Sequence, residues 1–268
     1  FDYLDEIFFE KNYNSLRNPL FLRVSKKINM KRILITLTLL LFSISPMFAH
    51  YLWLETDRTG SLNKEQEVRV YFGEYTYGVI EKVKGENYPS VSKFTLWLIH
   101  PNGKKTALKI SSKEEYYVAH FTPNTNGAYT VALNNDDIEV LDYTEWDFGI
   151  FKTHYQSTAK VQVGDQATAT KTLNQDGIVI KELPGTDSQI TLQVLFKGKP
   201  LAKNEFKLFV SDLWSKTIET DENGEVSFSL PWNTKYTMET TFEERVPGTF
   251  NGKEYEFIWH CATYCISK

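Results

Sequence analysis

The sequence contains few cysteines and none of the short motifs that mark common enzymes. Only two of its 268 residues are cysteine, Cys261 and Cys265, which excludes a small disulfide-rich scaffold. The nucleophile motif Gly-x-Ser-x-Gly, the Walker phosphate loop, the dinucleotide-binding glycine motif and His-Glu-x-x-His are all absent. We therefore predict a protein that binds a ligand and is not an enzyme.

Positive charge is also scarce. Residues 1–49 hold seven of the 30 basic and four of the 34 acidic residues, which leaves 23 basic and 30 acidic residues from position 50 onward. A region with a net charge of −7 does not attract a phosphate backbone. The charge therefore predicts that nucleic acid is not a partner.

An uncharged apolar run spans 33–44. It follows Met30-Lys31-Arg32 and ends shortly before the small residue Ala49. A basic start, an apolar centre of about 7–15 residues and a small residue at the cut are typical of a secretory signal peptide, and a membrane-spanning helix needs about 20 apolar residues. We predict a signal peptide at 30–49, no stable membrane span after cleavage, and a periplasmic or secreted protein.

The 29 residues ahead of this signal are predicted to be an upstream extension outside the fold. A genuine extension with a stop-transfer anchor is the alternative.

From position 50, short alternating or β-branched segments are bounded by turn residues, and helical periodicity is nearly absent. This pattern predicts an all-β protein of two tandem immunoglobulin-like or transthyretin-like antiparallel β-sandwiches. The boundaries are 50–164 for the first, 165–187 for a linker and 188–268 for the second. The predicted strands are 50–56, 67–72, 93–100, 106–110, 115–121, 128–133, 153–163, 189–196, 205–210, 216–220, 226–230, 236–245 and 254–266.

Two segments of the second half carry a resemblance. Gly198-Lys199-Pro200-Leu201 and Asp221-Glu222-Asn223-Gly224 resemble the carboxypeptidase-regulatory or transthyretin-like β-sandwich, which implies a fold and no activity.

The exported chain as a whole is similar to a bacterial periplasmic family of unknown function. The resemblance rests on Ala49-His50-Tyr51-Leu52-Trp53 and on Ala159-Lys160-Val161-Gln162-Val163-Gly164. Members are often labelled as the periplasmic component of cobalt or nickel transport, so the resemblance implies a metal ion or an envelope transport component as partner.

His50 becomes the first residue if the signal is cut after Ala49. Its α-amine and imidazole would then chelate one ion through two nitrogens, which suits nickel, cobalt or copper. A cut after Met47 would place His50 third, where backbone amides complete a square-planar copper or nickel site. The alternative is that His50 only starts the first strand.

His120 and His154 are the candidate second metal ligands. His120 lies on the face of Tyr116 and Val118, where a structural role is the alternative. His154 alternates with the predicted core positions of its strand, so it is expected to face solvent. The predicted metal site is therefore His50 with His120 or His154.

His260 is adjacent to Cys261, so the two should point to opposite faces of a strand. Glu243 or Glu244 is predicted to lie across a hairpin, where one of them could pair with His260. In an extended strand, four residues separate Cys261 from Cys265 by about 14 Å, beyond the roughly 4.4–6.8 Å that a disulfide tolerates. A bridge that needs a bend, and free or intermolecular thiols, both stay open.

The leading hypothesis is an exported periplasmic protein that binds or delivers a transition-metal ion through His50. The alternative is a non-catalytic envelope interaction module that binds carbohydrate or a protein partner through loops and exposed aromatic residues. Its candidate surface comprises the long connection 73–89 and a set of aromatic residues, most of which are expected in the core. The set is Tyr71, Phe72, Tyr75, Tyr77, Tyr88, Trp146, Trp214, Trp232 and Trp259. A third, metal-dependent redox chemistry at an N-terminal histidine, is the weakest hypothesis.

Overall fold

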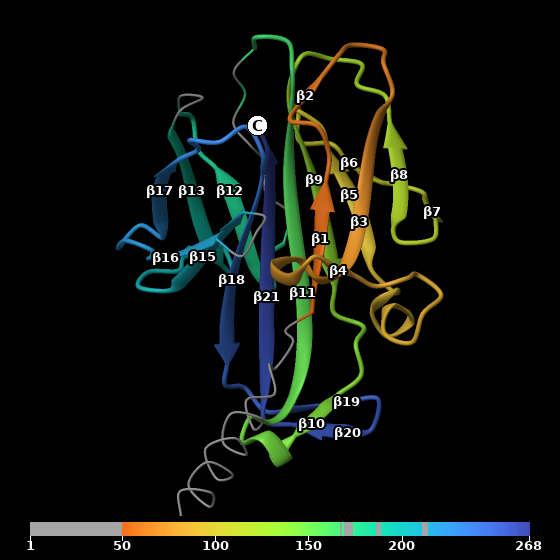
Figure 1. Cartoon of the computed structure of the whole chain (residues 1–268), viewed down its shortest axis with the longest axis vertical. Helices are drawn as coiled ribbons and strands as arrows, with labels where there is room; N and C mark the ends of the chain where they lie inside the picture. The colour runs from red at the N-terminus through yellow and green to blue at the C-terminus, as the bar shows by residue number, and fades with distance from the viewer. Residues whose placement is uncertain (1–49, 167, 169–173, 186–188, 211–213) are drawn as a thin grey trace, which may run out of the picture. The chain divides into compact units, whose positions relative to one another are not determined.

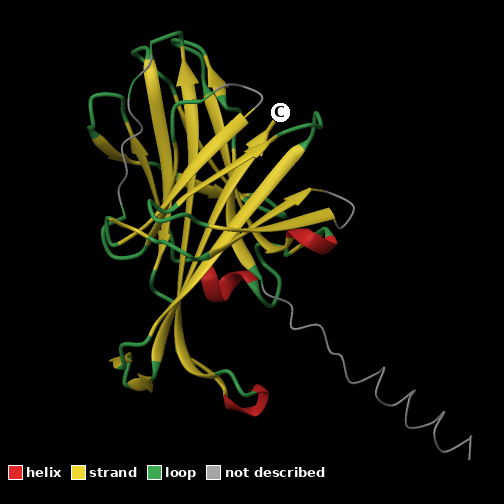
Figure 2. Cartoon of the chain, turned by 90° about the vertical axis from the view of Figure 1, so that its left-hand side faces the viewer, coloured by secondary structure: helices red, strands yellow, loops and turns green. Residues whose placement is uncertain are grey.

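The regular secondary structure of the described residues is almost all β-strand, as the sequence predicts. The computed structural model describes residues 50–166, 168, 174–185, 189–210 and 214–268, all within one compact unit. The predicted signal peptide and upstream extension lie outside the described residues. Figure 2 shows that the helical segments among these strands are short turns: η1 (Tyr75–Tyr77), η2 (Tyr88–Val91) and η3 (Thr144–Trp146).

The first half contributes β1 (Tyr51–Glu55), β2 (Thr59–Gly60), β3 (Gln66–Glu74), β4 (Val79–Ile80), β5 (Thr95–Ile99), β6 (Lys105–Ala107), β7 (Ile110–Ser112), β8 (Tyr117–Phe121), β9 (Gly127–Asn135), β10 (Leu141–Tyr143) and β11 (Gly149–Val163). The second half contributes β12 (Ile178–Glu182), β13 (Gln189–Phe196), β14 (Lys199–Pro200), β15 (Glu205–Val210), β16 (Trp214–Glu219), β17 (Glu225–Ser229), β18 (Lys235–Glu244), β19 (Gly248–Phe250), β20 (Lys253–Tyr255) and β21 (Phe257–Ser267).

Both halves share one long sheet, ordered β16-β15-β18-β21-β11-β9-β5-β6. Its centre is a parallel pair, β11 with β21, which lie side by side in Figure 1. A smaller sheet, β1-β3-β8-β7, packs on this pair through β1, and another, β12-β13-β14 with β17, packs on it through β12. The two sandwiches are therefore joined along a common sheet, while the domain boundaries predicted from the sequence stay predictions.

The central strands are covered on both faces. Ala159, Val161 and Val163 of β11 enter the first core with Leu52 and Leu54 of β1. The second core is formed around β13, β15 and β18 and includes Ala262, Tyr264 and Ile266 of β21, together with residues such as Ile180, Leu192, Val194, Phe206 and Met238. Side chains on the opposite faces of these two strands form hydrogen bonds to the small sheets. Thr158 Oγ1 donates to the carbonyl oxygen of Ile180 in β12, and Thr263 Oγ1 donates to that of Leu52 in β1.

The expectation that His154 faces solvent is wrong, because its side chain is only 5% exposed. The sequence pattern identified one core face of β11 correctly. It gave no sign that β21 would pair beside β11 and that a second sheet would cover the other face. A strand buried on both faces does not need strict alternation of apolar and polar residues.

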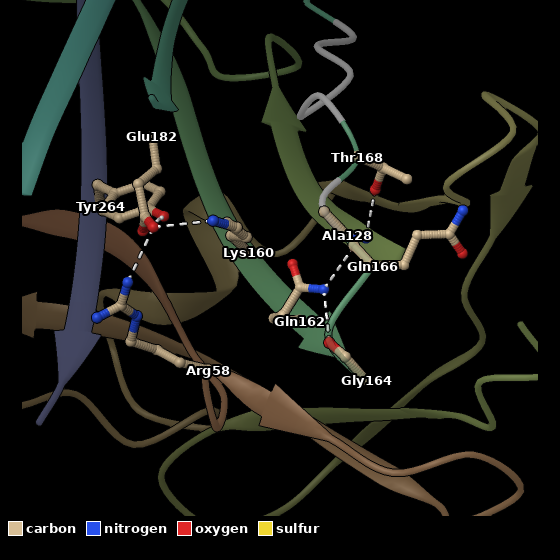
Figure 3. A network of polar contacts seen from close by, with 9 residues as sticks. All are labelled: Arg58, Ala128, Lys160, Gln162, Gly164, Gln166, Thr168, Glu182 and Tyr264. Atoms are coloured by element: carbon tan, nitrogen blue, oxygen red, sulfur yellow. Dashed lines mark hydrogen bonds and ion pairs between the residues drawn. The ribbon is translucent and has the colours of Figure 1, made fainter. Parts of the chain in front are cut away.

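The buried carboxylate of Glu182 connects the small sheet that contains β12 to the central sheet through hydrogen bonds (Figure 3). Glu182, at the end of β12, accepts hydrogen bonds from Arg58 Nη2 at 2.9 Å, Lys160 Nζ at 3.0 Å and Tyr264 Oη at 2.9 Å. A buried carboxylate stays charged when cations and hydrogen-bond donors surround it in this way. Strand β12 lies in the stretch that the sequence assigns to a linker, so the sequence missed this connection.

The last strand settles the geometry of the two cysteines. β21 runs through Cys261 and Cys265 without interruption, and both are free thiols. The predicted strand 254–266 is divided between β20 and β21, and the predicted strand 106–110 between β6 and β7.

Candidate functional site

His50 immediately precedes β1 and is held from several sides. Its Nε2 lies 2.8 Å from Oε1 of Glu81, and its ring centroid lies 5.3 Å from that of Phe72. Its backbone carbonyl accepts a hydrogen bond from the hydroxyl of Tyr155 at 2.8 Å. Both the ring and the main chain of His50 are therefore fixed, while 24% of its side chain stays exposed.

Strand pairing brings these groups together. β1 pairs with β3 so that Tyr51 opposes Gly73, which places His50 next to Glu74. β4 pairs with the same end of β3, with Ile80 opposite Gly73, and so carries Glu81 to the site.

Only glycine fits at position 73. Its φ is +151°, and a Cβ atom there would lie 2.2 Å from the carbonyl oxygen of Val79 in β4. A side chain at this position would push β4, and Glu81 with it, away from β3.

The charges around His50 fix its tautomer. Burial raises the pKa of Glu81, but hydrogen bonds from Asn87 and His50 outweigh burial and hold that pKa below its usual range. An ionised carboxylate only accepts hydrogen bonds, so Nε2 of His50 is the donor to Glu81. In the neutral ring this tautomer leaves the lone pair on Nδ1. The pKa of Glu74, in contrast, is raised by burial, an effect only partly offset by Thr76 and His50.

This arrangement fits a metal-binding histidine. Such histidines bind the ion through one ring nitrogen and donate the other N–H to a carboxylate or carbonyl oxygen. Across the described residues, however, no three His, Cys, Asp or Glu side chains are grouped so that they could hold a metal ion. A site at His50 would therefore depend on nitrogens of His50 itself.

His120 does not join His50. It lies on β8, 40% exposed, with Nε2 3.4 Å from Oε2 of Glu67. Its neighbour across the ladder is Glu67, whereas His50 lies beside Glu74, seven residues along β3. Seven residues of a strand span about 23 Å, so the two imidazoles are at opposite ends of the sheet.

His154 does not join His50 either. Its neighbour Tyr155 faces His50, so His154 points to the other face of β11. Nε2 of His154 lies 2.7 Å from Oδ1 of Asn134. Burial, followed by the nearby His260 and lysines, lowers its pKa to about 3, so its imidazole is neutral.

The structure reveals a histidine pair that the sequence analysis did not predict. The ring centroids of His154 and His260 are 5.1 Å apart. His260 Nε2 also lies 3.0 Å from Oε2 of Glu244, which confirms the predicted pairing across the hairpin. Glu81 was not predicted either, although it lies in the long connection 73–89.

Four of the candidate surface aromatics are exposed. Tyr77, Trp146, Trp214 and Trp232 have exposed fractions of 59%, 57%, 40% and 47%. Trp214 and Trp232 contact each other edge to face, with ring centroids 5.2 Å apart. Others from the same candidate set, Tyr71, Phe72 and Tyr88, are buried in the core.

Three solved structures resemble this chain only remotely. Alpha-2-macroglobulin of Escherichia coli, activated by porcine elastase, is 10% identical with a TM-score of 0.28, over 82% of this chain and 20% of that one. A CARDB domain of Pyrococcus furiosus in complex with di-metal ions is 17% identical with a TM-score of 0.23, over 44% of this chain and 90% of that one. The BSP domain of a biofilm-associated protein is 9% identical with a TM-score of 0.23, over 81% and 30%.

The chain thus spans about a fifth of the alpha-2-macroglobulin and under a third of the biofilm-associated chain. These similarities are too low to support an inference about activity. No curated protein sequence matches. Nowhere in the described ranges is a helix long and apolar enough to cross a membrane.

One family model matches well over half of the chain, from residue 47 to residue 244, and its description names no activity and no cobalt or nickel transport. The resemblance to a family of unknown function is thereby confirmed, without the transport label. The chain belongs to the family described as domain of unknown function DUF4198.

Proposed function

We propose that the exported protein binds a transition-metal ion, nickel, cobalt or copper, through the α-amine and Nδ1 of His50 after cleavage behind Ala49. The observation that supports this most is the 2.8 Å contact between Nε2 of His50 and the carboxylate of Glu81. That contact leaves Nδ1, the ring nitrogen nearest the main chain, free to chelate together with the amine of the same residue.

Such a site is open. One residue supplies two nitrogens, and solvent or a partner's ligand fills the remaining positions, whereas structural metal sites have a closed set of protein ligands. An open, partly exposed chelate suits an ion that is taken up and passed on. Two nitrogen donors favour copper over nickel and nickel over cobalt in raw affinity.

The match to the family model supports the predicted cut. It begins at residue 47, three residues before His50, so the family's domain starts close to the proposed N-terminus. The core strand β1 begins directly after His50.

Calorimetry tests the proposal. The chain beginning at His50 is titrated with Ni²⁺, Co²⁺ and Cu²⁺, beside His50→Ala and a matched control, His120→Ala, which removes an exposed imidazole elsewhere. We expect His50→Ala to bind one equivalent fewer than the unchanged chain, and His120→Ala to lose none. Equal binding by His50→Ala and the unchanged chain would refute a site at His50.

The exposed pair of Trp214 and Trp232 favours a second candidate function, an envelope interaction module. Exposed aromatic rings in contact are common at carbohydrate and protein interfaces. Binding of cell-wall glycan fragments that weakens at least tenfold in Trp232→Ala, but not in Trp146→Ala, is the result this candidate predicts. Equal binding by the unchanged chain, Trp232→Ala and Trp146→Ala contradicts it.

A further inference from the structure

His154 and His260 form a buried pair on β11 and β21, the two central strands of the long sheet. They are direct neighbours across the parallel ladder of β11 and β21, and their ring centroids are 5.1 Å apart. Their exposed fractions are 5% and 1%. Two imidazoles are therefore enclosed side by side on the face of β11 opposite to His50.

The hydrogen bonds of the pair assign both tautomers. His154 Nε2 lies 2.7 Å from Oδ1 of Asn134, and His260 Nε2 lies 3.0 Å from Oε2 of Glu244. Carbonyl and carboxylate oxygens accept hydrogen bonds, so both Nε2 atoms donate. Both Nδ1 atoms therefore carry a lone pair.

One of these lone pairs has no partner. Nδ1 of His260 is buried and makes no hydrogen bond to any described residue. Buried polar atoms nearly always have a hydrogen-bond partner, so a buried ring nitrogen without one indicates that a partner is missing.

The surroundings keep both rings in the form that metals bind. Burial lowers the pKa of both imidazoles, and Lys152 and Lys197 act in the same direction. At His260 the hydrogen bond and the charge of Glu244 raise the pKa, but burial outweighs them. Neutral imidazole is the ligand form of histidine. Lys197 in turn pairs with Glu244 and holds that carboxylate beside His260.

The geometry points to a second metal site, in which Nδ1 of His154 and Nδ1 of His260 together bind one copper, nickel or zinc ion. Imidazole nitrogens suit these ions. Asn134 and Glu244 occupy the place of the outer oxygen acceptors that orient metal-binding histidines. The carboxylate of Glu244 also offsets part of the positive charge that the ion brings into the core.

This site is independent of the proposed function at His50. It needs no cleaved N-terminus, and its rings lie on the other face of β11. The competing occupant of the space beside His260 Nδ1 is an ordered water molecule, which the experiment distinguishes from a metal.

The test starts from His50→Ala in the chain beginning at residue 50, which removes the first site. After removal of metal with a chelator, this protein is titrated with Zn²⁺, Ni²⁺ and Cu²⁺. His154→Gln and His260→Gln are added singly, because glutamine keeps a donor in the place of Nε2 and removes Nδ1. His120→Gln is the matched control. We expect one equivalent per chain, weakened at least tenfold by either buried substitution and unchanged by the control.

A second measurement does not depend on the variants folding. In ¹⁵N-histidine spectra of the His50→Ala protein, Zn²⁺ should shift the Nδ1 resonances of His154 and His260 and leave their Nε2 protons in place. Unshifted Nδ1 resonances at saturating Zn²⁺ overturn the site. If that happens while the unchanged chain still binds metal through His50, the proposed function survives alone.

Discussion

Nε2 of His50 and Oε1 of Glu81 are 2.8 Å apart although 31 positions separate them in the chain. The contact exists because β1 and β4 both pair with the end of β3. It fixes which nitrogen of His50 is available, so it connects the fold to the proposed chemistry.

Replacing Glu81 with glutamine should weaken metal binding without abolishing it. Removing the outer partner of a metal-binding histidine costs about 10–100-fold in affinity, whereas His50→Ala should remove the site. Calorimetry with Ni²⁺ measures both. Glu114→Gln, which breaks the exposed pair with Lys82, is the matched control and should bind normally. An unchanged affinity in Glu81→Gln would show that Glu81 does not orient the ring.

Gly73→Ala should damage both stability and the site. The new Cβ would meet the carbonyl oxygen of Val79 at 2.2 Å, so β4 has to move. Gly103 also has a positive φ, but a Cβ atom there would have no atom within 4 Å outside the adjacent residues. Gly103→Ala therefore reports the backbone strain alone, about 1 kcal/mol. Chemical denaturation should show a larger loss for Gly73→Ala, together with weaker metal binding. Equal losses in the two variants would mean that the close approach of β4 is unimportant.

Glu182→Ala should destabilise the protein strongly. It leaves Arg58, Lys160 and the buried hydroxyl of Tyr264 without their shared acceptor. Breaking a buried pair costs about 3–5 kcal/mol, and the partial exposure of Arg58 and Lys160 reduces this to about 2–4 kcal/mol. Urea denaturation measures the free energy of unfolding. Glu222→Ala, in an exposed pair with Lys203, should cost under about 1 kcal/mol.

Buried Glu239 should make stability fall as the pH rises. Burial raises its pKa, and hydrogen bonds from Tyr75 and Tyr51 and the charge of Lys207 only partly offset this. Above the unfolded pKa the folded state then binds more protons than the unfolded state, so stability decreases until the pH passes the folded pKa. Glu239→Gln should make the decrease smaller, and buried Glu74, whose pKa is also raised, accounts for part of what remains. The free energy of unfolding at several pH values from 4 to 8 checks it, with exposed Glu254→Gln as control; an identical slope in wild type and Glu239→Gln is the contrary result.

Much of the fold could be predicted from local patterns. Alternation and turn residues located most of the longer strands, because most of them alternate in polarity and several are followed by a glycine, proline or asparagine. Strand β12 could not be found in this way, since Ile178, Val179 and Ile180 form an unbroken apolar run within a stretch that reads as polar linker.

The site was predicted only in part. His50 was identified from the expected cleavage, but its partner Glu81 directly follows β4, a two-residue strand with no pattern of its own. His154 was expected at the surface because it alternates with the core positions of its strand. The expectation failed because β11 pairs with β21, a segment about a hundred residues away in the sequence. Local periodicity contains no information about such pairings.

Blocking the amine of His50 tests the central claim most directly. The chain beginning at His50 and the same chain with residues 45–49 retained are titrated with Ni²⁺ side by side, both as His154→Gln so that only the first site is measured. The account predicts a tight equivalent in the first protein and at least a hundredfold weaker binding in the second, because the amine is then part of a peptide bond. Equal affinity in the two proteins would contradict it.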